Sequence, residues 1–319
     1  MTRRASRSPG AVALLLAATA AAACRPSPQP APRETLRLTT GTPGAAFHPL
    51  GQALASAWRT ALPALHIAVQ ESAGSVANVD ALQQGSADVG LAYADVAYMA
   101  FTGQLSDQPE ALADLRGIAV LELAPVHLVI RAGSGIHGPG DLNGRRVAVG
   151  PTGSGSALTA GLVLRAFGIE AGAVRVESLR YNEAASRLAV GTIDAMFVTG
   201  RDPMESVLGS TRAGARVLPL SGPAIERLRH EYPFFKPTMI RGGTYPGHTD
   251  AVLTIGVDNL LVCRRGLAEP LVHDVTRAFF AGAPVLSMLG SMDLDQAPAT
   301  PIPLHDGAAR YYRERELAR

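Results

Sequence analysis

The chain has 319 residues, of which 47% are hydrophobic and 18% are charged, and its formal net charge is +2. These values suit one large or two medium globular domains and exclude a disordered chain or a coiled coil. The basic residues form no stripe, and aromatic residues make up 5% with a single Trp, so no nucleic-acid partner is expected.

The N-terminus has the three parts of an export signal. Residues 1–10 contain Arg3, Arg4 and Arg7 but no acid, and an unbroken apolar or small run follows over 11–23. The three alanines at 21–23 suit a cleavage site. We therefore predict a signal peptide over 1–23 and a periplasmic location. The apolar run is shorter than the roughly 20 residues that a spanning helix needs.

The residue that follows this signal is Cys24, as in a bacterial lipobox, although Ala21 stands where Leu is usual. We predict that Cys24 carries a lipid, and the alternative is an ordinary cysteine beside the cleavage site. Residues 24–35 are Pro-rich and are predicted to form a stiff tether. No later segment reaches spanning length, so the lipid is the only expected membrane contact. Cys263 lies in an apolar run, which favours a buried thiol and excludes a disulfide framework.

Strand and helix patterns alternate along the rest of the chain. Strands are predicted over 36–40, 65–70, 89–93, 117–131 with an interruption at Pro125, 146–150, 175–179, 193–198 and 252–264. Helices are predicted over 50–62, 76–84, 156–167, 182–190, 270–289 and 307–317, with a short helical turn at 141–144. This order predicts an α/β fold in two similar halves, with the two long strands forming a two-strand hinge.

Motifs for catalysis and cofactors are missing from the sequence. The eight histidines never pair at three- or four-residue spacing, and there is no H-E-x-x-H, C-x-x-C or G-x-S-x-G. Gly153-Ser154-Gly155-Ser156 opens a predicted helix, but Leu158 stands where a dinucleotide fingerprint needs its third glycine. We expect no metal, no cofactor and no catalytic residue. Several Gly/Ser/Thr turns between a strand and a helix are instead typical of anion binding by backbone N–H groups.

Several segments carry motifs in a recognisable order. They are TGTPGAAFHPLG at 40–51, SAGSVAN at 72–78, GLAYADVAY at 90–98, SGI and DLNGRRV within 134–147, GPTGSGS at 150–156, GTIDA at 191–195 and TYPG at 244–247. Together they resemble the TAXI family, the solute receptors of tripartite ATP-independent periplasmic (TRAP) transporters. The first and last motifs are specific to that family. D-L-x-G and G-x-I-D-A are shared by many type II periplasmic binding proteins.

The resemblance implies a two-lobed type II periplasmic binding protein, with residues 36–125 and 255–319 in lobe one and 126–254 in lobe two. It implies a receptor, not an enzyme, that captures a carboxylate or amino acid between the lobes and delivers it to the subunits of a TRAP permease. A receptor for an ABC importer or a sensor is the nearer alternative. An enzyme on the same fold is the other, and the sequence offers no general base with a partner at recognisable spacing.

The ligand-binding residues are expected at the turns that would border the cleft. They are Thr42, Gly44, Phe47, His48, Ser72, Gly74, Ser75, Tyr93 and Asp95 in lobe one, and Ser154, Gly155, Ser156 and Thr199 in lobe two. A ligand carboxylate is expected at the helix start after Thr152, on the hydroxyls of Ser154 and Ser156.

Each of these residues also has a purely structural interpretation. The glycines can serve turns, Phe47 can be a cleft wall, and Asp95 can be a helix cap. Ala45, His48 and Tyr93 depart from the family pattern, which leaves open a ligand other than the amino acids and small carboxylates associated with it.

Overall fold

The computed structural model describes residues 1–2, 34–105, 110–170, 172–282, 287, 289 and 294–318. The chain divides into two units, Met1–Arg33 and Glu34–Arg319, and the second is described below. Cys24, almost all of the predicted signal peptide and most of the tether lie outside the described residues. In the part of the chain that is described, no helix is both long enough and apolar enough to cross a membrane.

The first half of the unit is a parallel β/α layer. Strands β1 (Thr35–Thr39), β2 (His66–Gln70) and β3 (Val89–Tyr93) lie in the order β2-β1-β3. Each strand is followed by a helix, namely α1 (Phe47–Ala61), α2 (Ser75–Gln83) and α3 (Ala94–Thr102). Every residue of β3 is buried, as expected for a strand that is covered on both faces.

The second half repeats this plan. Strand β5 (Arg146–Ala148) pairs in parallel with β6 (Arg175–Glu177) and β7 (Ala195–Thr199). The helices are α4 (Gly155–Ala166) after β5, α5 (Tyr181–Ala189) after β6 and α6 (Glu205–Arg212) after β7, and the 3-10 turn η1 (Pro139–Leu142) precedes β5. Strand β8 (Arg216–Leu218), helix α7 (Pro223–Glu231) and strand β9 (Phe235–Ile240) complete it.

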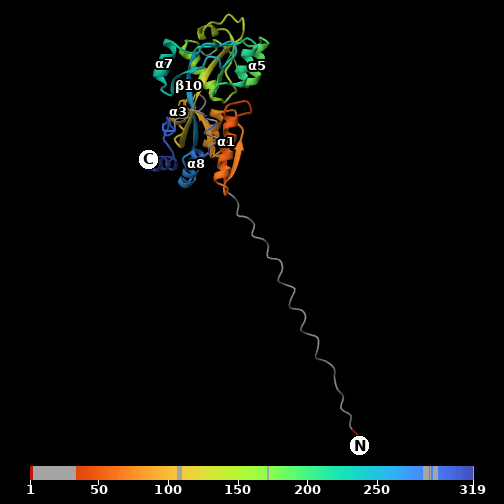
Figure 1. Ribbon diagram of the computed structural model, residues 1–319, viewed down its shortest axis with the longest axis vertical. Helices are drawn as coiled ribbons and strands as arrows, with labels where there is room; N and C mark the ends of the chain where they lie inside the picture. The colour runs from red at the N-terminus through yellow and green to blue at the C-terminus, as the bar shows by residue number, and fades with distance from the viewer. Residues whose placement is uncertain are drawn as a thin grey trace. The chain divides into compact units, whose positions relative to one another are not determined.

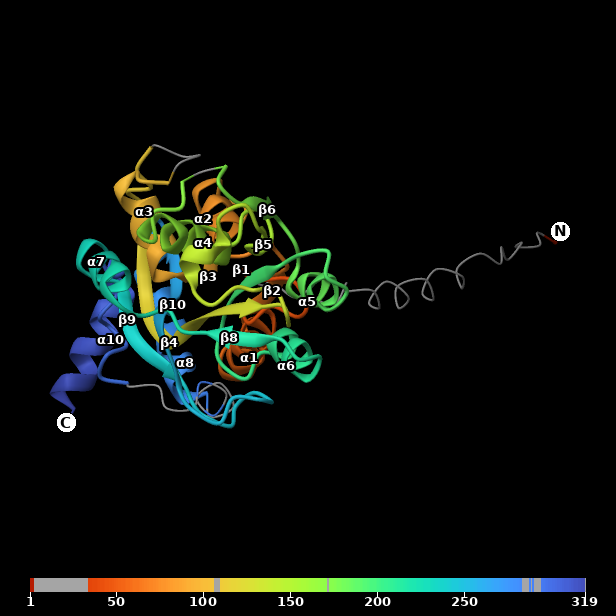
Figure 2. The ribbon, with the colours of Figure 1, turned by 90° about the horizontal axis from the view of Figure 1, so that it is seen from above.

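Two long strands connect the halves, β4 (Leu115–Ile130) and β10 (Val252–Arg264). They run antiparallel side by side (Figures 1 and 2), with β4 pairing with β10 over 115–125 and with β7 over 126–130. β10 in turn pairs with β3 over 259–263 and with β9 over 252–257. The sheet therefore reads β2-β1-β3-β10-β4-β7-β5-β6, with β8 and β9 on side branches.

The expected interruption of β4 at Pro125 is wrong, because the strand is continuous from Leu115 to Ile130. Pro125 lies where β4 changes partner, opposite Gly256 of β10 and one residue before Val126 pairs with Thr199 of β7. Its carbonyl accepts a bond from the backbone N–H of Gly200. A proline lacks an N–H group, and it is tolerated at the point where one ladder ends and another begins.

Each half has a buried aspartate, which is the last residue of a G-x-x-D sequence that directly precedes a strand. Asp88 accepts bonds from the backbone N–H of Arg37 at 3.0 Å and from its guanidinium at 2.9 and 2.8 Å, and a further bond from Arg264 at 2.7 Å. Asp194 in the second half accepts from the backbone N–H of Arg146 at 3.0 Å and from its Nε at 3.4 Å. Each carboxylate thus holds a residue of a neighbouring strand, Arg37 in the middle of β1 and Arg146 at the start of β5.

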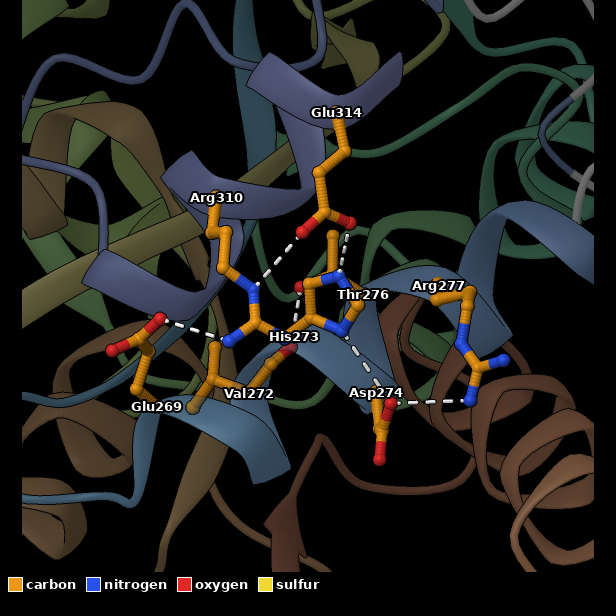
Figure 3. Close-up of polar contacts among 8 residues, drawn as sticks. All are labelled: Glu269, Val272, His273, Asp274, Thr276, Arg277, Arg310 and Glu314. Atoms are coloured by element: carbon orange, nitrogen blue, oxygen red, sulfur yellow. Dashed lines mark hydrogen bonds and ion pairs between the residues drawn. The ribbon is translucent and has the colours of Figure 1, made fainter. Parts of the chain in front are cut away.

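The C-terminal helices α8 (Glu269–Ala281) and α10 (Asp306–Leu317) pack against one another, and α8 also packs against α1. Figure 3 shows the polar contacts between them: His273 Nε2 lies 2.9 Å from Glu314, and Arg310 donates to Glu269 at 3.0 Å. Trp58 of α1 donates to the carbonyl of Val275 at 3.1 Å. The C-terminal segment therefore belongs to the first half.

Candidate functional site

A cavity of about 360 Å³ lies where the carboxyl ends of strands from both halves meet. The first half lines it with residues 41–47 after β1, 73–75 after β2, and Tyr93 at the end of β3. The second half contributes Pro151 and 154–156 after β5, and 180–183 after β6. A ligand in this cavity would therefore contact both halves at the edge where α/β sheets generally bind their ligands.

Five helices begin at this cavity. The lining includes the first residues of α1, α2, α4 and α5, and Tyr93, which is the N-cap of α3. The first four N–H groups of a helix have no partner within the helix, and the helix dipole places partial positive charge there. The cavity is therefore surrounded by donors and positive dipole ends, an arrangement that favours an anion.

The two halves touch directly around the cavity. The hydroxyl of Tyr93 donates to the carbonyl of Thr199 at 2.8 Å, and burial raises the pKa of Tyr93 well above its usual range, so it stays a neutral donor. The backbone N–H groups of Val76 and Ala77 in α2 donate to the carbonyl of Gly153 at 3.1 and 3.2 Å. The halves are thus held in a closed arrangement by the protein's own hydrogen bonds.

Glycine permits the closest of these approaches. A Cβ on Gly155 would lie 2.4 Å from Cδ2 of Tyr93 and 2.6 Å from Oγ of Ser75, both in the other half. Gly74 has a φ of +129°, which L side chains rarely adopt, and its Cβ position is 3.3 Å from the Cα of Ser154. Both glycines therefore have a structural role in closure in addition to lining the cavity.

The serines at the start of α4 already have protein partners. Ser154 is the N-cap of α4, and its Oγ accepts from the backbone N–H of Ala157 at 3.2 Å. Ser156 Oγ shares a short hydrogen bond with the hydroxyl of Tyr181, which also donates to the carbonyl of Thr199 at 3.4 Å. A ligand carboxylate would share these two hydroxyls with the protein, and one N–H group of the first turn of α4, that of Ala157, is already bound to Ser154.

Nine of the thirteen residues predicted from the sequence line the cavity, and their contact with a ligand stays a prediction. They are Thr42, Gly44, Phe47, Gly74, Ser75, Tyr93, Ser154, Gly155 and Ser156. The hydroxyl of Ser75 accepts from the backbone N–H of Tyr93 at 3.0 Å, and the ring of Phe47 packs 4.9 Å from that of Tyr93.

The other four predicted residues lie beside the cavity and not in its lining. Ser72 donates to the carbonyl of Thr40 at 3.0 Å and supports the turn before α2, and Thr199 supplies the carbonyl that both tyrosines reach. Nδ1 of His48 lies 3.8 Å from the carboxylate of Glu71. Asp95 is fully buried.

The sequence analysis did not predict the four residues at the start of α5: Arg180, Tyr181, Asn182 and Glu183. They follow β6, so the rule that selected the turns after β1, β2 and β5 would have found them. Within the described part of the chain, the guanidinium of Arg180 has no ion-pair partner, whereas Glu183 accepts from Arg187 at 2.7 Å. The cavity therefore gains a cation whose charge is not neutralised by a neighbouring acid.

No group of three or more His, Cys, Asp or Glu side chains that could hold a metal ion is present among the described residues. The cavity is lined by hydroxyl and N–H donors, the guanidinium of Arg180, three aromatic side chains, and the carboxylate of Glu183, which is paired with Arg187. These groups suit recognition of an anion by hydrogen bonds.

The chain is similar to a known protein family and to solved structures over most of its length. A model of the NMT1-like family matches residues 38–315. Among solved structures, the periplasmic binding protein BugD is 13% identical, with 90% of this chain and 95% of that chain covered and a TM-score of 0.57. MatC from Rhodopseudomonas palustris, solved with bound malate, is 16% identical, with 90% and 98% covered and a TM-score of 0.56. An ancestral arginine-binding protein bound to arginine is 19% identical, with 81% and 99% covered and a TM-score of 0.51.

These structures share the mixed α/β fold of type II periplasmic binding proteins. The predicted fold class is therefore confirmed. At these identities the likeness concerns the fold alone.

Proposed function

Because the chain belongs to the NMT1-like family, which corresponds to the TAXI-type solute-binding proteins of TRAP transporters, we propose that it captures a small organic anion and delivers it to a TRAP permease. Family membership confirms the predicted resemblance. The family consists of solute-binding proteins and not of enzymes, as predicted. The chain is accordingly a periplasmic solute-binding protein for transport.

The observation that carries the choice of an anion is the convergence of five helix N-termini on one cavity. Oriented N–H groups and aligned dipoles stabilise negative charge without an opposing buried charge that would have to be desolvated. Arg180 adds a guanidinium, which can bind a carboxylate through two parallel hydrogen bonds. The proposed ligand site is therefore the lining of this cavity.

An amino acid would also need a partner for its ammonium group. Glu183 is the one acid in the lining of this cavity, and its carboxylate already binds Arg187. Burying an ammonium group without a partner is costly. The cavity thus favours a mono- or dicarboxylate over an amino acid.

We assign residues 36–125 and 255–319 to lobe one and 126–254 to lobe two. This division is supported by the change of partner in β4 between Pro125 and Val126. Bending of β4 and β10 would open the cavity to solvent, a motion that is common in binding proteins of this architecture. We also propose that Cys24 carries a lipid and that this lipid anchors the protein to the membrane.

Calorimetry with succinate, L-malate and L-aspartate tests the ligand class, because L-malate and L-aspartate differ only in a hydroxyl against an ammonium group. We expect L-aspartate to bind at least about tenfold more weakly than L-malate, roughly 1.4 kcal/mol. Bound ligand should also raise the melting temperature. Amino acids that bind while a panel of mono- and dicarboxylates does not would contradict the proposal.

Arg180→Gln provides the residue-level test. Loss of a charge-assisted hydrogen bond should weaken binding of the tightest carboxylate by about tenfold or more, since such bonds contribute about 1.5–3 kcal/mol. Arg175→Gln is the matched control, because Arg175 is exposed on β6 of the same half and does not line the cavity.

An ATPase gene beside the gene for this protein, in place of a permease gene of the TRAP type, would favour an ABC importer instead.

A further inference from the structure

Asp95 has a buried carboxyl group that does not line the cavity. Its exposed fraction is 0%, as is that of Thr159, whose hydroxyl donates to Oδ2 of Asp95 at 2.6 Å. The other carboxylate oxygen accepts from the backbone N–H of Val96 at 2.8 Å. Asp95 therefore has one hydrogen bond within its own helix and one to a different helix.

The second bond connects the two halves of the molecule. Asp95 lies in the first turn of α3, which follows β3, and Thr159 lies in α4, which follows β5. The two helices pack against each other, as can be followed in Figure 2. Both helices begin at the cavity, with Tyr93 as the N-cap of α3 and Ser154 as the N-cap of α4.

We propose that Asp95 is a positioning residue for solute capture, whose buried bond to Thr159 sets the balance between the closed and the open arrangement of the two halves. It does not touch the ligand. It acts through α3 and α4, whose N-termini must come together for the cavity to form. The inference rests on the proposed function only in taking opening and closing of the halves as the motion that admits the solute.

The charge of Asp95 makes this balance depend on pH. Burial raises the pKa of Asp95 to about 6 from 3.8, although the bonds from Thr159 and Val96 oppose this shift. When the halves separate, water reaches the carboxyl group and its pKa returns toward the ordinary value. The closed arrangement therefore holds a proton more tightly than the open one.

The sign of the effect follows from this difference. Below the ordinary pKa both arrangements are protonated, and closure is most favourable. As pH rises, the open arrangement loses its proton first, so closure weakens until pH passes the raised pKa of about 6, above which both arrangements are ionised. At neutral pH the buried charge thus favours reopening, which is what a receptor needs in order to release its solute.

Helices α2 and α4 and strands β3 and β10 pack against α3, the helix that carries Asp95. Tyr93, the last residue of β3 and the N-cap of α3, stays neutral because burial raises its pKa. The other charged or titratable side chains on the elements packed against α3 are Asp80 of α2, Arg165 of α4, and Asp258, Cys263 and Arg264 of β10. Asp258 pairs with Lys236 and Arg264 with Asp88, and burial raises the pKa of Cys263. The pKa of Asp95 is set by burial and hydrogen bonds and not by a neighbouring charge.

The test measures closure without any ligand, so its outcome does not depend on the proposed ligand class. Spin labels on Gln84→Cys in α2's C-cap and Val176→Cys in β6 report the distance between the halves, in a chain that carries Cys24→Ser. Both sites are exposed, and Cys263 is buried. Between pH 4.5 and pH 7.5 we expect the ratio of closed to open molecules to fall by at least roughly tenfold.

Asp95→Asn should abolish this pH dependence, because the amide keeps a polar partner for Thr159 but carries no charge. Asp114→Asn is the control, an exposed acid of the same half whose side chain is 84% accessible. It should keep the pH dependence of the parent chain. A pH-independent ratio in the parent chain, or an unchanged pH dependence in Asp95→Asn, would overturn the proposal.

A second pair of variants covers the case in which Asp95→Asn does not fold. Thr159→Val removes the hydroxyl at nearly constant volume and should lower the closed fraction at pH 7.5 by several-fold. Thr159→Ser keeps the hydroxyl and should restore the closed fraction. Equal closed fractions in Thr159→Val and Thr159→Ser would show that the bond does not position the halves.

Discussion

At the scale of single residues, Asp88 shows how one buried carboxylate links two strands through ion pairs. Its side chain is 5% exposed and pairs with Arg37 of β1 and Arg264 of β10. Burial raises the pKa of Asp88, but the bonds from Arg37 and Arg264 outweigh it and leave the pKa below its usual value. The ionised carboxylate is therefore part of the folded structure.

We expect Asp88→Asn to lower the free energy of unfolding at pH 7 by about 2 kcal/mol, since it weakens charge-assisted bonds at a buried site. Because the folded pKa lies below the unfolded one, this contribution is present above about pH 4 and is lost as pH falls through the folded pKa. Urea denaturation of both chains at pH 7 and pH 3.5 measures it. An identical urea midpoint for the two chains at pH 7 would contradict it.

Tyr245, in the motif that is specific to the family, also proves to be structural. Its hydroxyl donates to Nε2 of His127 at 3.0 Å and accepts from the backbone N–H of Met204 at 2.9 Å. Burial lowers the pKa of His127 to about 4, so the imidazole is neutral and can accept this bond. The motif therefore holds the 200–204 loop against β4 and does not line the cavity.

At the scale of elements, the start of α4 must fit closely against the first half. Gly155 has no room for a Cβ beside Tyr93 and Ser75, whereas Gly161, two turns later in the same helix, has open space around it. A side chain at position 155 would act as a wedge between the halves. The same substitution at position 161 would only add a methyl group to a half-buried helix position with free space around it.

We therefore expect Gly155→Ala to increase the radius of gyration in small-angle scattering and to weaken carboxylate binding by at least about tenfold, roughly 1.4 kcal/mol. Gly161→Ala should leave both unchanged and should raise stability slightly, by up to about 1 kcal/mol, because alanine favours a helix. If Gly155→Ala binds and scatters like the parent chain, the closed arrangement is not the one that holds the solute.

At the scale of the whole molecule, the proposed anchor decides where the receptor works. A lipid on Cys24 would keep the cavity close to the membrane, and the Pro-rich residues after it would act as a spacer. We expect the parent chain in membrane fractions and Cys24→Ser in the soluble periplasmic fraction. The same soluble distribution for both would argue against the lipid and leave export intact.

Much of the architecture could be predicted from local sequence patterns. The predicted strands over 89–93 and 252–264 coincide with β3 and β10, and α4 and α5 begin within one residue of their predicted starts. These elements have strong apolar runs or clear Gly/Ser turns at their ends, which are local signals. The region from α6 to β9 was not predicted, because β8 has only three residues, half of β9 is exposed and it contains Pro237, and the helices of this region are polar on average.

The sequence by itself determined the class of fold, the two halves and the turns after β1, β2 and β5 that border the cavity, because period, turn residues and motif order are properties of neighbouring residues. Only the tertiary structure decided which of those turns meet. It brought Arg180 to the cavity, gave Ser156 a partner in Tyr181, and placed Asp95 against Thr159 and not in the lining of the cavity. These contacts join residues that are 25 to 64 positions apart, and such pairings are fixed by the packing of whole helices and strands.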